Sequence, residues 1–288
     1  MPSKITGLIA HTGKEGAASL VEKLCKEFAK HSAEVKIESK TAGLIGLDSP
    51  YSTYDLGEIC DVLLVLGGDG TILQVLRDLG DRIKPIFGIN LGSLGFLTCV
   101  SSDGYLRAMK CILNEAYTLS YRTLLDVAVL RNGTEIAARR GLNDAVISRG
   151  ELSRLIMLQV KIDGAVLTDY NADGLIISTP TGSTAYALSA GGPILTPDSG
   201  VFVITPICPH VLTNRSVIVN DRAEIEVWPC KGQRELFLTV DGQELVVIQP
   251  GDRIRIRKAA NDLPLAMLPG ISFSEVLCQK LKWSGSAV

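Results

Sequence analysis

The fold is decided by one run of sequence, Val62-Leu63-Leu64-Val65-Leu66-Gly67-Gly68-Asp69-Gly70-Thr71. Its first five residues are apolar, which is the length and pattern of a strand buried on both faces. Three glycines and an aspartate follow directly, and a helix is expected to begin near Thr71. A buried strand that ends in a glycine turn before a helix is typical of an open α/β sheet, which binds ligands at the carboxyl ends of its strands.

The same alternation extends on both sides of this run. Further strands are predicted at residues 5–9, 35–37 and 85–89. Apolar residues at helical spacing predict helices at residues 20–28 and 106–113. Strands that alternate with helices form a parallel sheet with helices on its faces. We therefore expect an α/β N-terminal domain with a parallel, Rossmann-like sheet over residues 1–118, completed by a C-terminal helix within residues 268–288.

The pattern changes to short alternating strands near residue 119. Three dipeptides that favour tight hairpins lie in this region: Asn132-Gly133, Asp163-Gly164 and Asp241-Gly242. Helical patterns are scarce until the tail. Residues 119–267 are therefore predicted to form an all-β sandwich as a C-terminal domain.

Composition excludes several classes of protein. The 288 residues carry a formal net charge of -2, so nothing draws the chain generally to nucleic acid or to a membrane. The seven cysteines are odd in number and form no CxxC pair, which argues against a disulfide framework or a zinc site. The N-terminus lacks a signal-peptide core, and no stretch approaches the ~20 apolar residues of a membrane span. A cytoplasmic location is expected.

The first candidate site is the glycine loop itself. Gly67, Gly68, Gly70 and Thr71 form a predicted phosphate loop, since glycine permits positive φ and backbone N–H groups at a helix start bind anions. Asp69 is an unusual choice beside phosphate, unless it accepts a proton from an attacking hydroxyl or meets a metal. The alternative is a turn in which Asp69 or Thr71 caps the helix. Neither GxGxxG nor GxxxxGK[ST] is present here, which disfavours hydride transfer and P-loop hydrolysis.

Three further segments carry candidate residues. A second glycine loop over residues 90–96 follows the next strand and could line the same crevice, or be a plain connection. Residues 173–186 run from a buried strand into a segment rich in hydroxyls, which suit ribose, amide and phosphate groups, and Tyr186 could stack on adenine. The pair Asn143-Asp144 could form hydrogen bonds with an adenine edge and a sugar diol, although the residues alone favour a turn.

Together these segments resemble the NAD kinase family in its bacterial form. The motif GGDGT, the Asn143-Asp144 pair and the run DGLIISTPTGSTAYALSAGGPI at residues 173–194 occur in the family's order, over about residues 59–252. The long run is highly specific. GGDG-type loops also occur in phosphofructokinases and diacylglycerol kinases, so that motif alone indicates phosphoryl transfer.

The resemblance implies that NAD binds between two domains and that ATP, with a divalent metal such as Mg²⁺, is the donor, although some members use polyphosphate. It implies that Asp69 is the base acting on the 2′-hydroxyl of the adenosine ribose. It implies NAD contacts at the following positions: Asp69, Gly70, Asn143, Asp144, Arg154, Asn171, Asp173, Thr184, Ala185, Tyr186, Ala187, Leu188, Ser189 and Gln243. Arg154 and Asn171 fall at positions that vary in the family, and Asp144 replaces a glutamate found in many members.

The resemblance also implies a homodimer or homotetramer, in which β-domains of neighbouring subunits help complete the NAD site. Two other functions stay open at this stage. A lipid kinase related to diacylglycerol kinases would need an apolar acceptor pocket. A regulator that senses NAD or NADP without turnover would have little use for a carboxylate at Asp69.

Overall fold

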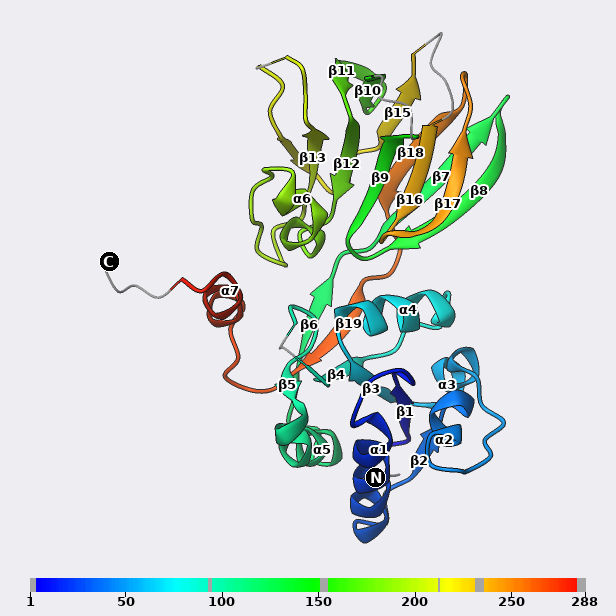
Figure 1. The fold of residues 1–288 in the computed structure, drawn as a ribbon, viewed down its shortest axis with the longest axis vertical. Coiled ribbons are helices and arrows are strands. Elements are labelled where there is room, and N and C mark those ends of the chain that lie inside the picture. Colours follow the sequence, from blue (N-terminus) through cyan, green and yellow to red (C-terminus); the bar gives the residue numbers. More distant parts are fainter. Residues whose placement is uncertain (1–3, 93–94, 151–154, 212, 231–235, 284–288) are drawn as a thin grey trace. The chain divides into compact units, whose positions relative to one another are not determined.

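A computed structural model describes residues 4–92, 95–150, 155–211, 213–230 and 236–283 (Figure 1). The chain divides into two compact units. Unit 1 comprises Met1–Tyr121 and Leu263–Val288, and unit 2 comprises Arg122–Asp262. Each unit is described by itself.

Unit 1 is an α/β unit built on one seven-stranded sheet. The strands lie in the order β2-β1-β3-β4-β19-β6, and β5 pairs with β4. Its strands are β1 (Thr6–Ala10), β2 (Val35–Ile37), β3 (Val62–Gly67), β4 (Ile86–Asn90), β5 (Val100–Ser101), β6 (Thr118–Arg122) and β19 (Leu263–Met267). Its helices are α1 (Ala17–Lys30), α2 (Ser39–Gly43), α3 (Thr53–Ile59), α4 (Asp69–Leu79), α5 (Tyr105–Leu113) and α7 (Phe273–Leu281), with a 3-10 turn η1 (Ser102–Gly104).

The central strands of unit 1 are parallel, as the alternation predicts. β1 pairs in parallel with β2 and β3, and β4 pairs in parallel with β3, β5 and β19. The sheet as a whole is mixed. Its last strand, β6, leaves the unit while its neighbour β19 enters it, so the two run in opposite directions (Figure 1).

Helix burial in unit 1 follows the apolar spacing of the sequence. α1 buries Leu20, Leu24 and Phe28 at four-residue spacing. These side chains join a core with Leu64 and Leu66 of β3, which are 0% exposed. The core fixes β3 in the middle of the sheet and so holds the glycine loop at its carboxyl end.

Unit 2 is an antiparallel β sandwich of two six-stranded sheets. The strand orders are β11-β10-β15-β18-β7-β8 and β14-β13-β12-β9-β16-β17. The strands are β7 (Leu125–Arg131), β8 (Thr134–Gly141), β9 (Asp144–Arg149), β10 (Ile156–Ile162), β11 (Ala165–Ala172), β12 (Gly174–Ser178), β13 (Val201–Ile207), β14 (Val217–Asn220), β15 (Ile225–Pro229), β16 (Leu236–Val240), β17 (Gln243–Ile248) and β18 (Arg253–Lys258). The 3-10 turn η2 (Gly182–Thr184) and the short helix α6 (Tyr186–Ser189) lie in the loop between β12 and β13 (Figure 1).

The three hairpins that the dipeptides predict are all present. Asn132-Gly133 joins β7 and β8, Asp163-Gly164 joins β10 and β11, and Asp241-Gly242 joins β16 and β17. Both residues of every pair have positive φ, between 49° and 82°. This is the turn type whose twist matches that of the flanking strands, so these predictions are confirmed.

No helix among the described residues is both long and apolar enough to cross a membrane.

Candidate functional site

The glycine loop after β3 is shaped by close packing rather than by positive φ. A Cβ on Gly67 would lie 2.2 Å from Oγ1 of Thr71, so only glycine leaves room for that side chain. The Gly68 N–H donates to the same Oγ1 at 3.2 Å. None of Gly67, Gly68 and Gly70 has positive φ, so that part of the sequence-based argument was wrong. Gly70 is exposed, with open space where a side chain would be.

Asp69 does not cap its own helix. It is the first residue of α4, and its carboxylate accepts hydrogen bonds from the backbone N–H of Phe96 at 2.9 Å and of Leu97 at 3.1 Å. A Cβ on Gly95 would lie 1.8 Å from Oδ1 of Asp69, so a glycine is required where the carboxylate meets the second glycine loop. These two hydrogen bonds from backbone N–H groups fix the carboxylate and leave about half of its lone-pair sites unused.

The two glycine loops therefore lie side by side, at the carboxyl ends of β3 and β4. Gly67 is in register with Asn90, and the Leu91 N–H donates to the Gly67 carbonyl at 3.1 Å. The ring of Phe96 packs on that of Phe273 in α7, with 6.4 Å between centroids. The predicted adjacency of the two loops is confirmed.

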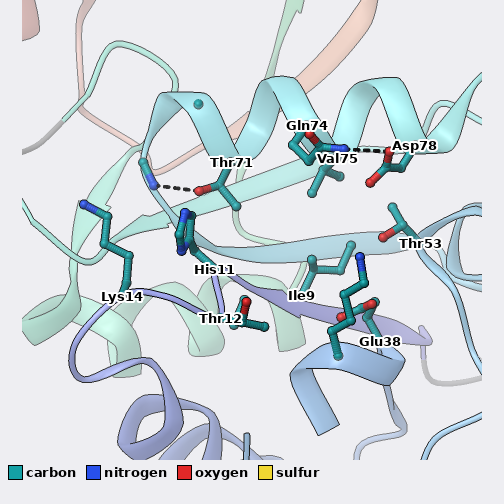
Figure 2. Close-up of a pocket in the computed structure, with 14 residues that line it drawn as sticks. Ile9, His11, Thr12, Lys14, Glu38, Thr53, Thr71, Gln74, Val75 and Asp78 are labelled. Atoms are coloured by element: carbon teal, nitrogen blue, oxygen red, sulfur yellow. Dashed lines mark hydrogen bonds between the residues drawn. The ribbon is translucent and has the colours of Figure 1, made fainter. Parts of the chain in front are cut away.

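A cavity of about 600 Å³ opens beside the glycine loop, within unit 1 (Figure 2). Its size is that of a small-molecule site. The cavity lies between the loop after β1, the start of α2, α3 and one face of α4. It is lined by Ile9, Ala10, His11, Thr12, Lys14, Glu38, Lys40, Thr53, Gly68, Gly70, Thr71, Gln74, Val75 and Asp78.

Sequence reasoning missed the contribution of the loop after β1. His11 and Lys14 are exposed and line the cavity opposite the start of α4. The pairing of β1 with β3 puts Ala10 in register with Leu66, so both strand ends reach the same edge. The predicted parallel sheet could have indicated this loop, because a parallel sheet places the residues that follow each central strand along one edge.

In unit 2, the Asn143-Asp144 pair and the hydroxyl-rich loop meet at one end of the sheet. β9 and β12 pair so that Asp144 lies opposite Ser178. Thr179 donates to the Asn143 carbonyl through its N–H at 2.9 Å and to the Leu142 carbonyl through its hydroxyl at 2.5 Å. A Cβ on Gly182 would lie 2.1 Å from the Asn143 carbonyl oxygen, so glycine allows the two segments to touch.

Asp241 holds the Asn143 segment from the other side. Its carboxylate accepts from the N–H groups of Leu142 at 2.8 Å, Asn143 at 2.7 Å and Asp144 at 3.1 Å. Sequence reasoning saw Asp241 only as a turn residue. Gln243, a predicted NAD contact, begins β17 two residues later.

The carboxyl of Asp144 is buried, with 4% of the residue exposed. Burial, and then the nearby charge of Asp241, raise the pKa of Asp144 to about 7. Burial also raises the pKa of Asp241, and the hydrogen bonds that its carboxylate accepts from three backbone N–H groups partly oppose this rise. The three backbone N–H donors favour the ionised form of Asp241, so Asp144 is the carboxyl of the two that is more readily protonated.

Most hydroxyls of the loop after β12 build the loop itself. Ser178, Thr179 and Ser183 are all 0% exposed. The Ser183 hydroxyl donates to the Pro180 carbonyl at 2.6 Å and accepts from the Leu195 N–H at 2.9 Å. These buried side chains hold the loop in shape, and none of the three is among the predicted NAD contacts.

The residues available for contact lie further along the loop. Tyr186 is 47% exposed and Ser189 is exposed, while Ala185 and Leu188 are half-buried. Ala187 is fully buried against Val146 and Ile176, which anchors α6 on the sheet. The half-buried Thr184 donates its hydroxyl to the Thr181 carbonyl at 3.1 Å.

Two predicted NAD contacts lie at the opposite end of β12. Asp173 directly precedes β12 and forms an ion pair of 3.3 Å with Arg149, and Asn171 is in β11. Asp173 precedes Ser178 by five residues, which is about 17 Å of extended strand. Within a single copy of unit 2, Asp173 therefore does not lie beside Asp144. Arg154 lies outside the described residues.

No group of three or more metal-ligating side chains occurs in the described part of the chain. All seven cysteines are free thiols.

Two family descriptions match the chain. Residues 6–117 match "ATP-NAD kinase N-terminal domain", and residues 142–268 match "ATP-NAD kinase C-terminal domain". Among similar proteins, the NAD kinase of Geotalea daltonii is 48% identical over 80% of this chain and 81% of its own length. The NAD kinase of Natranaerobius thermophilus is 38% identical over 96% of each chain.

Solved structures share the fold. Yeast NADH kinase, complexed with NADH, superposes with a TM-score of 0.89 over 100% of this chain and 90% of its own, at 24% identity. An NAD kinase from Archaeoglobus fulgidus, in complex with ATP, gives 0.74 over 98% of this chain and 100% of its own, also at 24% identity.

Proposed function

The chain belongs to the NAD kinase family, and from that premise we propose that it transfers the γ-phosphoryl group of ATP to the 2′-hydroxyl of the adenosine ribose of NAD, giving NADP. The observation that carries the proposal is the setting of Asp69. Its carboxylate is fixed by two backbone amides at the strand end where a cavity of small-molecule size opens.

Asp69 is the base in this mechanism. Its free lone pairs accept the proton of the ribose 2′-hydroxyl as that oxygen bonds to the γ-phosphorus. The bond from the γ-phosphorus to the bridging oxygen breaks, and ADP leaves with that electron pair. Because the transition state of phosphoryl transfer is loose, the catalyst mainly positions the groups and stabilises charge. The exposed Gly70 and its neighbours offer backbone N–H groups at the start of α4 for the donor phosphates.

A divalent cation such as Mg²⁺ suits this unit if the donor supplies most of its ligands. Mg²⁺ retains water and binds phosphates with one or two protein oxygens, so no dedicated cage is needed. Asp69 and Thr71 provide oxygen atoms at this strand end. When bound, the cation neutralises charge that develops on the phosphate oxygens.

Unit 2 supplies the NAD contacts. The half-buried Asn143 and the exposed ring of Tyr186 are available for the adenosine half. Thr184 to Ser189 and Gln243 lie on the same two loop segments that Asp241 and Gly182 hold together. Asp144, if protonated, can donate a hydrogen bond as well as accept one.

The chain is further proposed to act as a homo-oligomer. Asp173 lies about 17 Å of strand from the Asp144 end of β12, and Asn171 precedes it by two residues, so within one copy these residues cannot contact the same adenosine half as Asn143 and Asp144. A second copy would bring these residues to the first copy's site. Both sheets of unit 2 also end in edge strands that carry exposed apolar residues, Val166 on β11 and Leu245 on β17, which an interface would cover.

Mixed subunits test this arrangement. Asp69→Asn and Asp173→Ala each lose activity as pure proteins, but co-expressed together they form some sites with both residues intact. Recovered activity, with a dimer or tetramer by light scattering, supports the proposal. A fully active monomer at assay concentration contradicts it.

The cytoplasm is the proposed location. All seven thiols are free, and a reducing compartment keeps them so.

The activity itself has a direct test. Purified protein is incubated with ATP, Mg²⁺ and NAD, and NADP is measured with an NADP-specific dehydrogenase. The same incubation with diacylglycerol detects lipid phosphorylation. NADP formation is the expected result. Phosphorylated lipid without NADP would indicate a lipid kinase, and tight NAD binding without turnover would indicate a regulator; either result overturns the proposal.

A further inference from the structure

The carboxylate of Asp69 is held by a neighbouring loop and not by its own helix. Two consecutive residues, Phe96 and Leu97, donate their N–H groups to its two oxygens at 2.9 and 3.1 Å. A carboxylate that is bound through both oxygens takes its orientation from the two donors. The contacts that fix the backbone at positions 96 and 97 therefore also fix the carboxylate.

Leu97 is fixed by the interior of unit 1. It is 2% exposed, and the next residue, Thr98, is 1% exposed. The Thr98 hydroxyl accepts from the Gly95 N–H at 2.9 Å. The backbone here packs directly on β4, since a Cβ on Gly88 would lie 3.1 Å from Cα of Thr98 and 3.2 Å from the Leu97 carbonyl oxygen. One of the two donors to Asp69 is thus part of a close-packed interior.

Phe96 is held differently, by a contact with the C-terminal helix. Its side chain is half-buried, whereas Gly95 and Leu97 on either side are buried. Its ring packs on the ring of Phe273, the first residue of α7, with 6.4 Å between the centroids and 41° between the planes. Aromatic pairs are favourable at centroid distances of about 4.5–7 Å, beyond the effect of the apolar area that they bury. The second donor to Asp69 therefore depends on a side chain of α7.

The start of α7 gives Phe273 a defined position. The Ser272 N–H donates to Oε2 of Glu275 at 3.0 Å, and the Glu275 N–H donates to Oγ of Ser272 at 3.2 Å. This reciprocal pair is a capping box, which fixes the first turn of a helix. Val276 is buried in the same turn. The ring of Phe273 is thus presented to Phe96 from an ordered helix start.

Support of the core does not account for α7. All nine of its residues are described, and only Val276 among them is buried. None of the nine belongs to the hydrophobic core that contains β3 and β4. A helix that adds so little burial contributes little to the stability of the unit. Its contact with Phe96 therefore calls for another explanation.

We propose that Phe273 is a positioning residue for phosphoryl transfer, whose ring fixes Phe96 and so fixes one of the two N–H groups that orient the carboxylate of Asp69. This inference rests on the proposed function, in which Asp69 is the base. Phe273 acts through Phe96 and is not itself a catalytic residue. Without its ring, the backbone at Phe96 gains freedom and the carboxylate follows it. Misplacement of a reacting group by about 1 Å can cost on the order of 10²-fold in rate.

The role is tested first by steady-state kinetics of Phe273→Ala. Its kcat should fall about 10- to 100-fold, while the KM for ATP stays within about twofold, because an interaction that acts on the chemical step changes kcat and not binding. The matched control is Leu281→Ala, which removes a half-buried apolar side chain at the other end of α7, about 12 Å away along the helix axis. Its kcat should stay within about twofold of wild type. Equal kcat values for the two variants would overturn the role of Phe273.

A double-mutant cycle with Asp69→Asn tests whether the effect passes through the carboxylate. If it does, Phe273→Ala should lower the residual kcat of Asp69→Asn by less than about threefold, because residues that act as a unit are not additive. A full 10- to 100-fold loss in both backgrounds would show that Phe273 acts independently of Asp69, and it would refute the inference.

Thermal melting of each variant accompanies the kinetics. If Phe273→Ala does not stay folded at the assay temperature, Phe273→Leu takes its place in the same cycle, since it keeps an apolar side chain and loses the ring. Its kcat should fall about two- to tenfold, the scale of a lost aromatic pair. A kcat of Phe273→Leu equal to that of wild type would contradict a role for the ring.

Failure of the inference and failure of the proposed function give different results. If wild type makes no NADP, the proposed function fails. If wild type makes NADP and Asp69→Asn is strongly impaired, but Phe273→Ala matches Leu281→Ala, only the positioning role of Phe273 fails.

Discussion

The loop after β3 in unit 1 and the loop after β12 in unit 2 both follow a fully buried strand, but they use their polar side chains differently. In unit 1, Asp69 reaches out of its own loop to the amides of Phe96 and Leu97. In unit 2, the Ser183 hydroxyl donates to the Pro180 carbonyl of its own loop, and the Thr179 hydroxyl donates to the Leu142 carbonyl in the segment before β9, so both uncharged groups are used to hold backbone in place. The first loop offers a charged group and backbone amides, whereas the second offers a rigid frame for a few exposed side chains. A motif residue is thus assigned to chemistry or to support only when its partners are known.

The comparison is tested most strongly at Asp69. Asp69→Asn should lower kcat about 10²- to 10⁴-fold, the usual scale for one acid–base group. The amide NH₂ would also face one of the two backbone N–H groups, which costs about 1–3 kcal/mol of stability. Steady-state kinetics, NAD titration by calorimetry and thermal melting on the same sample separate the two effects. Near-normal kcat would remove Asp69 from the chemistry and leave it as an anchor of the second glycine loop.

In the loop of unit 2, the largest effect is expected at Gly182. Gly182→Ala places a methyl group 2.1 Å from the Asn143 carbonyl, and backbone on both sides cannot easily move. The free energy of unfolding should fall by about 1–3 kcal/mol or more, and NAD affinity should fall with it. Gly43→Ala, with open space around its Cβ in α2, should leave melting unchanged. Normal melting of Gly182→Ala would show that this loop is not a rigid frame.

The buried carboxyl of Asp144 predicts a pH dependence. Its pKa is raised from 3.8 to about 7 by burial and by the charge of Asp241. The folded state therefore holds this proton more tightly than the unfolded state, so the contribution to stability is present below about pH 4 and is lost as the pH rises to about 7.

Asp144→Asn removes this titration. At pH 8 the variant should be more stable than wild type by about 1–3 kcal/mol, and at pH 4 the difference should vanish. Thermal melting without ligand across this range is the measurement. If the melting temperatures of the two proteins differ by the same amount at every pH, Asp144 is ionised throughout and its charge is compensated by a partner.

The smallest effects are expected at Tyr186, where the ring should matter more than the hydroxyl. Tyr186→Ala should raise the KM for NAD about 5- to 150-fold, the range for a base stacked on an aromatic ring. Tyr186→Phe should change it little, since no described residue bonds the hydroxyl. Equal losses in the two variants would assign the contact to the hydroxyl.

The fold was predictable from the sequence because its signals are local. Apolar runs located β1, β3 and β4, and each Asn-Gly or Asp-Gly pair located a hairpin. The short helices α2 and α3 were missed. They have only five and seven residues, and their starts depend on single caps, Glu38 and Ser52, which give a weak signal.

The candidate residues were predictable, but their partners were not. The bonds of Asp69 to Phe96 and Leu97 span 27 and 28 residues, and those of Asp241 to the Asn143 segment span 97 to 99. Such contacts depend on which strands are neighbours and in what register. For the same reason, the sequence could not show that Asp173 and Asp144 lie at opposite ends of adjacent strands.

The position of β19 has a consequence for how the protein is made. This strand lies between β4 and β6 in the sheet of unit 1, and its Leu263, Leu265 and Ala266 are fully buried. It reaches the ribosomal exit only after all of unit 2 has been synthesised. Until then, the Ile86–Phe87 part of β4, which β5 does not pair with, presents an open edge that can pair with other chains. Unit 2 is therefore positioned to fold first, although more than a hundred residues of unit 1 precede it. Nascent chains that stop before Leu263 would be expected to aggregate through that unpaired edge.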